Sequence, residues 1–164
     1  MEKMPITRAG FARLKRELEV LKTVSIPENI KDIEIARAQG DLSENAEYAA
    51  AKERQSFLHG KMQELENNLA TSDVIDLKNL SCEKVVFGST VTVEDSNTGK
   101  KIAYQLVGPC ESDLARNRIS VTSPIGKALI SKCCGDEISV KTPGGIRDFQ
   151  VVYFRAGRGV IKSP

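Results

Sequence analysis

The stretch Gln39-Gly40-Asp41-Leu42-Ser43-Glu44-Asn45-Ala46-Glu47-Tyr48 lies between two long helical patterns, and it places three carboxylates, Asp41, Glu44 and Glu47, close together. Glycine adopts positive φ at little cost and commonly ends helices, so Gly40 is the expected turn. Asp41 then stands where a helix N-cap belongs, and Glu44 follows at the spacing of a capping box. From spacing alone, these two acids are more often a helix cap than a catalytic pair.

The flanking patterns predict an antiparallel helical hairpin. Apolar residues recur at the 3-4 spacing of a coiled-coil seam before the turn, at Phe11, Leu14, Leu18 and Leu21, and again after it, at Leu58, Met62, Leu65 and Leu69. Paired from the outer ends inwards, they share a midpoint at about residue 40, which is the Gly-Asp turn. Each arm of roughly 30 residues spans about 45 Å. Because each arm already has its partner, the pattern argues against a coiled-coil dimerisation module.

Local signals predict where the helices begin and end. Thr7 is the expected N-cap of a first helix that starts at Arg8, and the second helix is expected from about Leu42 to Ala70. Ser25-Ile26-Pro27-Glu28 reads as a second capping box inside the first arm. The seam slips there by one residue, from Leu21 to Ile26, Ile30 and Ile33. We interpret the slip as a kink or local adjustment within one long arm, with a short break as the alternative.

Composition narrows the class of protein. The 164 residues are 40% hydrophobic and carry a net charge of +2, which is too mild for a free-standing DNA binder. No apolar run reaches the roughly 18 residues of a membrane span, and the N-terminus lacks a signal-peptide pattern, so we expect a cytoplasmic protein without a membrane partner. The four cysteines show no CxxC spacing and His59 is the only histidine, which argues against a structural metal.

The second half of the sequence has the pattern of strands, turns and one short helix that is typical of a small α+β domain. β-branched runs separated by turn residues predict about five strands, and Ser123-Pro124 introduces a short helix over roughly residues 125–131. The strand-like runs are Val85–Phe87, Thr90–Glu94, Lys101–Val107, Ile119–Val121, Ile138–Val140 and Phe149–Phe154. We therefore predict three parts: a hairpin over 1–78 with its acidic tip at 40–48, an α+β domain over 79–156, and a glycine-rich, basic, flexible tail over 157–164.

Three motifs in this order resemble the bacterial Gre transcript-cleavage factors, and the GreA type among them. The first is Gly40–Tyr48 on a helical hairpin; the second is Ile119–Gly126 followed by Ala128-Leu129-Ile130; the third is Lys141-Thr142-Pro143-Gly144-Gly145. Leu42 favours the GreA type, because the GreB type usually carries arginine there. Cys133-Cys134 and the long tail depart from the family pattern.

The resemblance implies a fold and a partner. The fold is an N-terminal antiparallel coiled coil followed by a C-terminal FKBP-like domain. The partner is bacterial RNA polymerase: the C-terminal domain docks at the rim of its secondary channel, and the hairpin of a monomer reaches down that channel to a backtracked RNA 3′ end. The protein is then a cofactor of the polymerase's own RNA cleavage and no enzyme by itself.

The resemblance also assigns roles to residues. Asp41 and Glu44 are the expected catalytic acids, which would share an Mg²⁺ ion only inside the polymerase and orient water. Asn45 and Tyr48 would position water or RNA, and Arg37 and Lys52 would hold RNA phosphates. The simpler interpretation of the two cations is an exposed ion pair with neighbouring Glu34 or Glu53. Ser123 and Pro124 are polymerase-contact candidates by resemblance and a plain helix start on structural grounds.

Two alternative functions follow from the same features. A Gre-like protein could occupy the channel without promoting cleavage, but such a regulator should have an altered tip, whereas Asp41 and Glu44 are both present. An FKBP-like domain also raises the possibility of a peptidyl-prolyl isomerase. That activity needs an aromatic-lined pocket, and the chain has five Phe, three Tyr and no Trp.

Overall fold

The computed structural model describes residues 3–41, 45–75, 83–156 and 160–162. The chain divides into two compact units. One is the helical segment Phe11–Thr71, and the other combines Met1–Gly10 with Ser72–Pro164. Helices dominate the first unit and strands the second, so the predicted α+β class is confirmed.

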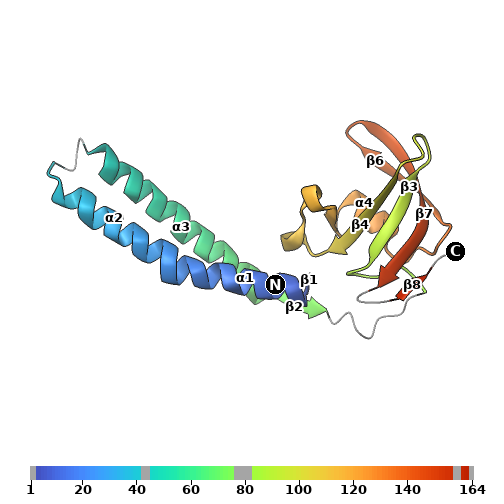
Figure 1. Ribbon diagram of the computed structural model, residues 1–164, viewed down its shortest axis with the longest axis horizontal. Coiled ribbons are helices and arrows are strands. Elements are labelled where there is room, and N and C mark those ends of the chain that lie inside the picture. The colour runs from blue at the N-terminus through green and yellow to red at the C-terminus, as the bar shows by residue number, and fades with distance from the viewer. Residues whose placement is uncertain (1–2, 42–44, 76–82, 157–159, 163–164) are drawn as a thin grey trace. The chain divides into compact units, whose positions relative to one another are not determined.

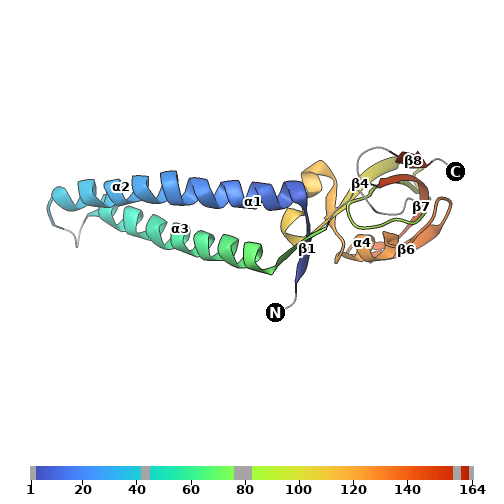
Figure 2. The ribbon, with the colours of Figure 1, turned by 90° about the horizontal axis from the view of Figure 1, so that it is seen from below.

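Two antiparallel arms make the helical unit. The first arm contains α1 (Arg8–Val20), a π-helical turn η1 (Leu21–Ser25) and α2 (Ile26–Ala38); the second arm is α3 (Ala46–Thr71). Figures 1 and 2 show α1 and α2 as one row that runs alongside α3. The predicted hairpin is therefore confirmed, and its seam consists of the buried side chains of Leu14, Leu21, Ile33, Ala36, Ala51, Leu58 and Leu65.

The π-helical turn explains the slip of the seam. A π turn holds one more residue than an α turn, so it shifts every later side chain by one position around the axis. The first arm stays continuous through Ser25, whose backbone is α-helical (φ −68°, ψ −46°) and whose side chain makes no capping hydrogen bond. The prediction of a second capping box was therefore wrong, whereas that of a local adjustment within one arm is confirmed.

The seam resumes on a polar residue. Asn29 is only 2% exposed, whereas the neighbouring Ile30, which the pattern placed in the seam, is 47% exposed. The Asn29 side-chain Nδ2 donates a hydrogen bond to the Ala51 carbonyl on the facing arm, at 3.0 Å. This bond satisfies the buried amide and fixes the register between the arms, as buried polar residues do in coiled coils.

Two short strands flank the helical arms. β1 (Met4–Thr7) pairs in parallel with β2 (Ser72–Ile75), and the sequence analysis predicted neither strand. Four-residue strands leave too little alternation to be recognised in a sequence. The hydroxyl of Thr7 accepts a hydrogen bond from the Gly10 amide at 3.0 Å, which confirms Thr7 as the N-cap of α1.

The second unit is built on one curled sheet. Its strands lie in the order β5-β4-β3-β7-β6, with β8 paired to β7. The β4–β5 pair is parallel, and the other pairs are antiparallel. The bounds are β3 (Thr90–Asp95), β4 (Lys101–Val107), β5 (Arg118–Ser120), β6 (Glu137–Thr142), β7 (Gly145–Ala156) and β8 (Val160–Lys162). Between the strands lie two 3₁₀ turns, η3 (Pro109–Glu111) and η4 (Leu114–Arg116), and the helix α4 (Pro124–Leu129).

A dense apolar core holds this sheet together. The side chains of Val91, Leu106, Leu129, Phe149 and Val151 are fully buried in it. They come from β3, β4, α4 and β7, and the core also includes Val85, Val93, Tyr104, Ile119, Ile138, Val140 and Phe154. The run Val85–Phe87, which we predicted as strand-like, lies outside any strand, although Val85 contributes to this core.

Within the second unit, a buried carboxylate joins β1 to the turn η3. Glu111, 5% exposed, accepts hydrogen bonds from the Thr7 amide at 3.1 Å, the Thr7 hydroxyl and the Gly108 amide at 2.9 Å. A Cβ on Gly10 would lie 2.0 Å from the Glu111 Oε1 atom, and a Cβ on Gly108 would lie 1.9 Å from the Pro5 carbonyl oxygen. Position 108 therefore requires glycine, because the backbone of Pro5 cannot move aside, whereas a side chain at position 10 would displace the Glu111 carboxylate from its hydrogen bonds.

Part of the segment 157–164, for which we predicted a flexible tail, lies in a strand. β7 continues to Ala156, and β8 pairs with it from Val160 to Lys162. Three residues of the segment 157–164 are therefore part of the sheet. The remaining residues of that segment lie outside the described part of the chain.

Candidate functional site

The candidate site lies at the turn of the hairpin. α2 ends at Ala38, and the Gln39 amide donates a hydrogen bond to the Ala36 carbonyl at 3.2 Å. Gly40 follows with φ +118°, which side-chain-bearing residues rarely adopt, so the predicted role of this glycine is confirmed. Asp41 comes next and is exposed. The turn therefore places an exposed acidic residue at the closed end of the hairpin.

Asn45 closes the turn by contacting both arms. Its Oδ1 atom accepts a hydrogen bond from the Tyr48 amide at 3.0 Å, which makes Asn45 the N-cap of α3. Its Nδ2 atom donates to the Ala36 carbonyl on α2 at 2.7 Å. The second helix, which we predicted from about Leu42, is α3, which starts at Ala46 with Asn45 as its cap. The cap that we predicted at Asp41 would act on residues 42–44, which lie outside the described residues.

The other predicted tip residues are spread over the two arms. Arg37 lies in the last turn of α2 and is exposed, and Tyr48 is half-buried in the first turn of α3. Lys52 is exposed, and its Nζ atom donates to the Gln55 Oε1 atom at 2.9 Å. Among the described residues, neither Arg37 nor Lys52 forms an ion pair, so the simpler interpretation with Glu34 or Glu53 is not realised.

Glu44 and Leu42 lie outside the described residues, so the structure does not place the second predicted acid relative to Asp41. Within the described ranges, no three His, Cys, Asp or Glu side chains gather as a metal-binding group.

The second predicted contact region is the start of α4. The Ser123 hydroxyl accepts a hydrogen bond from the Gly126 amide at 3.1 Å and donates to the Ser120 carbonyl at 2.6 Å, so the predicted cap is confirmed. Pro124 is the first helical residue and is exposed. A Cβ on Gly126 would lie 2.1 Å from the Ser120 carbonyl oxygen, so only glycine allows this tight packing. These contacts hold Ser123 and Pro124 in one fixed arrangement.

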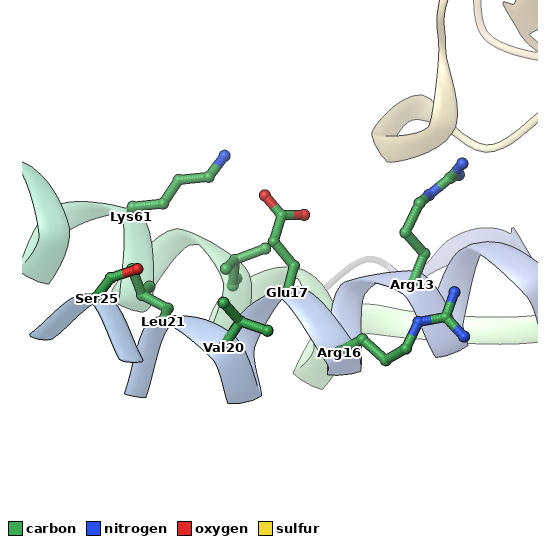
Figure 3. Close-up of a pocket in the computed structure, with 8 residues that line it drawn as sticks. Arg13, Arg16, Glu17, Val20, Leu21, Ser25 and Lys61 are labelled. Atoms are coloured by element: carbon green, nitrogen blue, oxygen red, sulfur yellow. The ribbon is translucent and has the colours of Figure 1, made fainter. Parts of the chain in front are cut away.

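Two grooves on the hairpin escaped the sequence analysis. The larger, about 610 Å³, lies beside the π turn and is lined by Arg13, Arg16, Glu17, Val20, Leu21, Ser25, Lys61 and Leu65. Figure 3 shows Arg13, Glu17 and Lys61 extending to the same side. The smaller, about 360 Å³, is lined by Asp32, Ile35, Ala36, Glu47, Ala50, Ala51 and Arg54. The sequence could have indicated these grooves, because residues three and four apart on a helix share a face, and the groove residues follow that spacing beside the seam.

Comparison with known proteins identifies the class. A family model described as "Transcription elongation factor, N-terminal" matches residues 4–74, and one described as "Transcription elongation factor, GreA/GreB, C-term" matches residues 80–155. The class is thus that of transcription elongation factors. The chain belongs to the GreA/GreB family.

Two relatives named as GreA agree with this assignment. The transcription elongation factor GreA of Syntrophus aciditrophicus is 72% identical over 152 residues, which cover 93% of this chain and 94% of that protein. GreA of Rhodospirillum rubrum is 52% identical over 157 residues, or 96% and 100% of the two chains. The crystal structure of GreA factor homolog 1 of Thermus thermophilus is 28% identical over 94% of this chain and 100% of that one, with a TM-score of 0.44. No helix of the described residues is long and apolar enough to cross a membrane.

Proposed function

We propose that this elongation factor binds bacterial RNA polymerase in the cytoplasm and stimulates the polymerase to cleave backtracked RNA. The observation that carries the proposal is the exposed Asp41 carboxylate, which directly follows the Gly40 turn of a GreA/GreB-family hairpin. An arm of this length supports the idea that the tip acts at depth in a partner. The hairpin would enter the secondary channel as a monomer, with its closed end towards the RNA 3′ end.

Asp41 and Glu44 would share an Mg²⁺ ion with the polymerase. Mg²⁺ prefers hard oxygen ligands and keeps several waters, so one or two carboxylates from this chain suffice as its share. When bound, the ion supplies Lewis acidity and an activated water for phosphodiester hydrolysis. The two carboxylates would orient that water by accepting its hydrogen bonds. The chain would not be a nuclease by itself, because most ligands of the ion belong to the polymerase.

The other residues of the tip would hold the RNA and the turn. Arg37 and Lys52 are exposed cations that could contact phosphates of the extruded RNA. Tyr48 and the remaining hydrogen-bonding capacity of Asn45 would position RNA or water. Asn45 would also keep Asp41 in place, because its two hydrogen bonds join the arms beside the turn. Ser123 and Pro124 would contact the rim of the channel through the fixed start of α4.

A cleavage assay tests this function. A stalled, backtracked polymerase complex carrying end-labelled RNA is incubated with Mg²⁺ and the full chain, and RNA shortening is followed with time. Removing a group that stabilises a transition state costs about 100-fold or more in rate, so we expect such losses for Asp41→Ala and Glu44→Ala. Glu34→Ala, which removes an exposed carboxylate on the side of α2, is the matched control and should cleave like the wild type.

Polymerase binding is measured in parallel by competition with labelled wild-type chain. The proposal requires that both tip variants bind normally while cleavage fails. If the wild type binds the polymerase but never accelerates cleavage, the chain is a channel-occupying regulator, and the proposed function is wrong.

A further inference from the structure

The two grooves lie on one side of the hairpin. Along α3, Glu47, Ala50, Arg54, Phe57 and Lys61 are spaced alternately three and four residues apart, so they share one face beside the seam. The smaller groove uses the first three of these residues and the larger groove uses the last. Phe57 stands between them on the same face.

The two grooves carry opposite charges. The larger groove has three cations, Arg13, Arg16 and Lys61, against Glu17, for a net charge of 3 − 1 = +2. The smaller groove has two acids, Asp32 and Glu47, against Arg54, for a net charge of 1 − 2 = −1. We call them the basic groove and the acidic groove. The charge therefore changes sign along a single face of the hairpin.

These charges are not neutralised within the described part of the chain. Among its ion pairs, the only one that involves a charged residue of either groove joins the Lys61 Nζ and Glu64 Oε2 atoms, at a long 3.8 Å. Arg13 and Arg16 are exposed, as are Asp32 and Glu47. Both grooves therefore present charges that a partner of opposite sign can use.

Large apolar side chains accompany the grooves. Phe57 is 69% exposed, Ile35 in the acidic groove is 59% exposed, and Val20 in the basic groove is 53% exposed. A phenylalanine exposed to this degree loses little by being covered and gains from leaving water. Apolar anchors surrounded by charges are typical of interfaces between proteins.

We propose that this face binds a second copy of the chain in a two-fold, antiparallel arrangement of the hairpins. Phe57 lies about midway along α3 between the groove residues 47–54 and 61–65, so a two-fold axis near Phe57 places each basic groove on the acidic groove of the other copy. A partner of a single sign would meet one attracting and one repelling groove. The same face of a second copy, turned to run antiparallel, presents an acidic groove to the basic groove and a basic groove to the acidic one. The occupant that we propose is therefore the same chain.

The dimer is a property additional to the proposed function, and it would reduce the amount of chain that can act on the polymerase. Residues that it covers, such as Asp32 and Glu47, adjoin the closed end of the hairpin. A hairpin paired in this way could not also enter a polymerase, so only the monomer would be active. The association would store the factor when its concentration exceeds that of its partner.

Sedimentation velocity of the full chain tests the proposal. The chain is measured between about 1 and 200 µM, since narrow interfaces give weak dimers, and at about 50 and 500 mM salt, since screening weakens charge pairing. We expect a dimer that forms with rising concentration and dissociates at the higher salt. Phe57→Ser should weaken it at least about 10-fold, as loss of a central anchor does. Leu114→Ser, which alters a side chain 77% exposed on the sheet unit, is the control and should leave it unchanged.

Charge reversal separates pairing of the grooves from general effects of charge. Arg13→Glu with Arg16→Glu should weaken the dimer at least about 10-fold, because both grooves then carry acids. Adding Asp32→Lys and Glu47→Lys to the same chain should restore dimerisation. Lys100→Glu with Lys101→Glu changes the net charge equally at two exposed positions at the start of β4 and should have no such effect. Circular dichroism verifies that each variant keeps its helices.

Several results would overturn the proposal. A wild-type chain that stays monomeric over the whole range excludes the dimer. So does a four-residue reversal that fails to restore association although its helices are intact. If the chain is monomeric and the Arg13→Glu, Arg16→Glu variant instead loses polymerase binding, the face belongs to the polymerase. If the wild-type chain stimulates RNA cleavage but does not dimerise, the proposed function stands and only the proposed dimer is refuted.

Discussion

The hairpin and the sheet unit are stabilised in different ways. In the hairpin, buried side chains recur once or twice per turn along a single seam, from Leu14 and Leu65 at one end to Ala36 near the tip. In the sheet unit, buried side chains of four or more elements converge on one core around Phe149. The hairpin spreads its stability along its length, whereas the sheet unit concentrates it.

This difference affects how each unit tolerates local irregularity and substitution. A seam tolerates local irregularity, so the hairpin can hold a π turn, a buried Asn29 and two grooves without losing its overall register. The sheet also holds one irregularity, a register shift between β3 and β7 at Thr92 and Val93, but its core residues are close-packed and contact several strands. Substitutions of buried residues should therefore cost more in the sheet unit than in the hairpin seam, and four measurements, the last on a charged pair of the sheet, test and extend that comparison.

The largest effect should come from the sheet core. Phe149→Ala removes a ring that is 0% exposed and leaves a cavity, so the free energy of unfolding should fall by about 3–5 kcal/mol. Amide hydrogen exchange over β3 and β7 reports this loss separately from the hairpin. Tyr153→Ala, at a side chain 37% exposed on the same strand, is the control and should cost much less. Equal losses for the two variants would contradict a concentrated core.

The next effect should come from the buried carboxylate. Glu111→Ala leaves the Thr7 and Gly108 amides without their acceptor inside the protein, which should cost about 3 kcal/mol and speed exchange over β1. Glu137→Ala removes an exposed carboxylate on β6 and should be close to neutral. Protection of β1 that survives in Glu111→Ala would show that the β1–β2 pairing is sufficient without this contact.

A smaller effect is expected in the hairpin seam. Asn29→Ala deletes the hydrogen bond to the Ala51 carbonyl and should lower the stability of the hairpin by about 1 kcal/mol, measured by urea unfolding followed at 222 nm. Ile30→Ala should cost less, although isoleucine is the more apolar residue, because Ile30 is 47% exposed. A reversed order would show that the seam follows the sequence pattern through Ile30 and not the π-shifted register.

The smallest effect should come from a charged pair on the sheet. The Arg147 guanidinium, whose Nη2 atom lies 2.9 Å from the Asp95 Oδ2 atom, and the Asn97 amide hold the pKa of Asp95 below its ordinary value. A lowered folded-state pKa gives stability that is complete above the unfolded pKa of about 3.9 and is lost as the pH falls through the folded value.

Asp95→Asn should therefore destabilise the sheet unit at pH 7, and its difference from the wild type should shrink below about pH 4. Urea midpoints measured across this range give the comparison, with Glu137→Gln as a control that lacks a partner arginine among the described residues. A difference that stays constant down to the lowest pH would show that the charge of Asp95 contributes nothing to stability.

Sequence reasoning succeeded where one repeated pattern controls the structure. The 3-4 spacing and Gly40 predicted the hairpin and its turn, and the hydroxyl of Thr7 and the Ser123-Pro124 pair predicted two helix starts. It failed where two candidates competed for one role. The capping pattern at Asp41 predicted a helix start at Leu42, whereas α3 starts at Ala46 with Asn45 as its cap, and the fold of the turn also brings the Ala36 carbonyl to Asn45.

For the candidate site, too, the sequence predicted one part and the structure added another. The resemblance carried by Gly40–Tyr48 proposed the acids, and the family assignment agrees with it. The structure adds that Asp41 is exposed and that Asn45 joins the arms, while Glu44 lies outside the described residues. The roles of Asp41, Glu44, Arg37, Tyr48 and Lys52 in cleavage remain predictions until the assay is done.

The sequence by itself determined the α+β class, the hairpin, its turn and the family, because periodicity, glycine and short motifs act locally. Only the tertiary structure decided the pairing of β1 with β2, the contact of Glu111 with Thr7, the entry of Asn29 into the seam and the two grooves of opposite charge. Each of these joins residues far apart in the chain. Such contacts depend on which surfaces the folded elements bring together, and no local pattern records that choice.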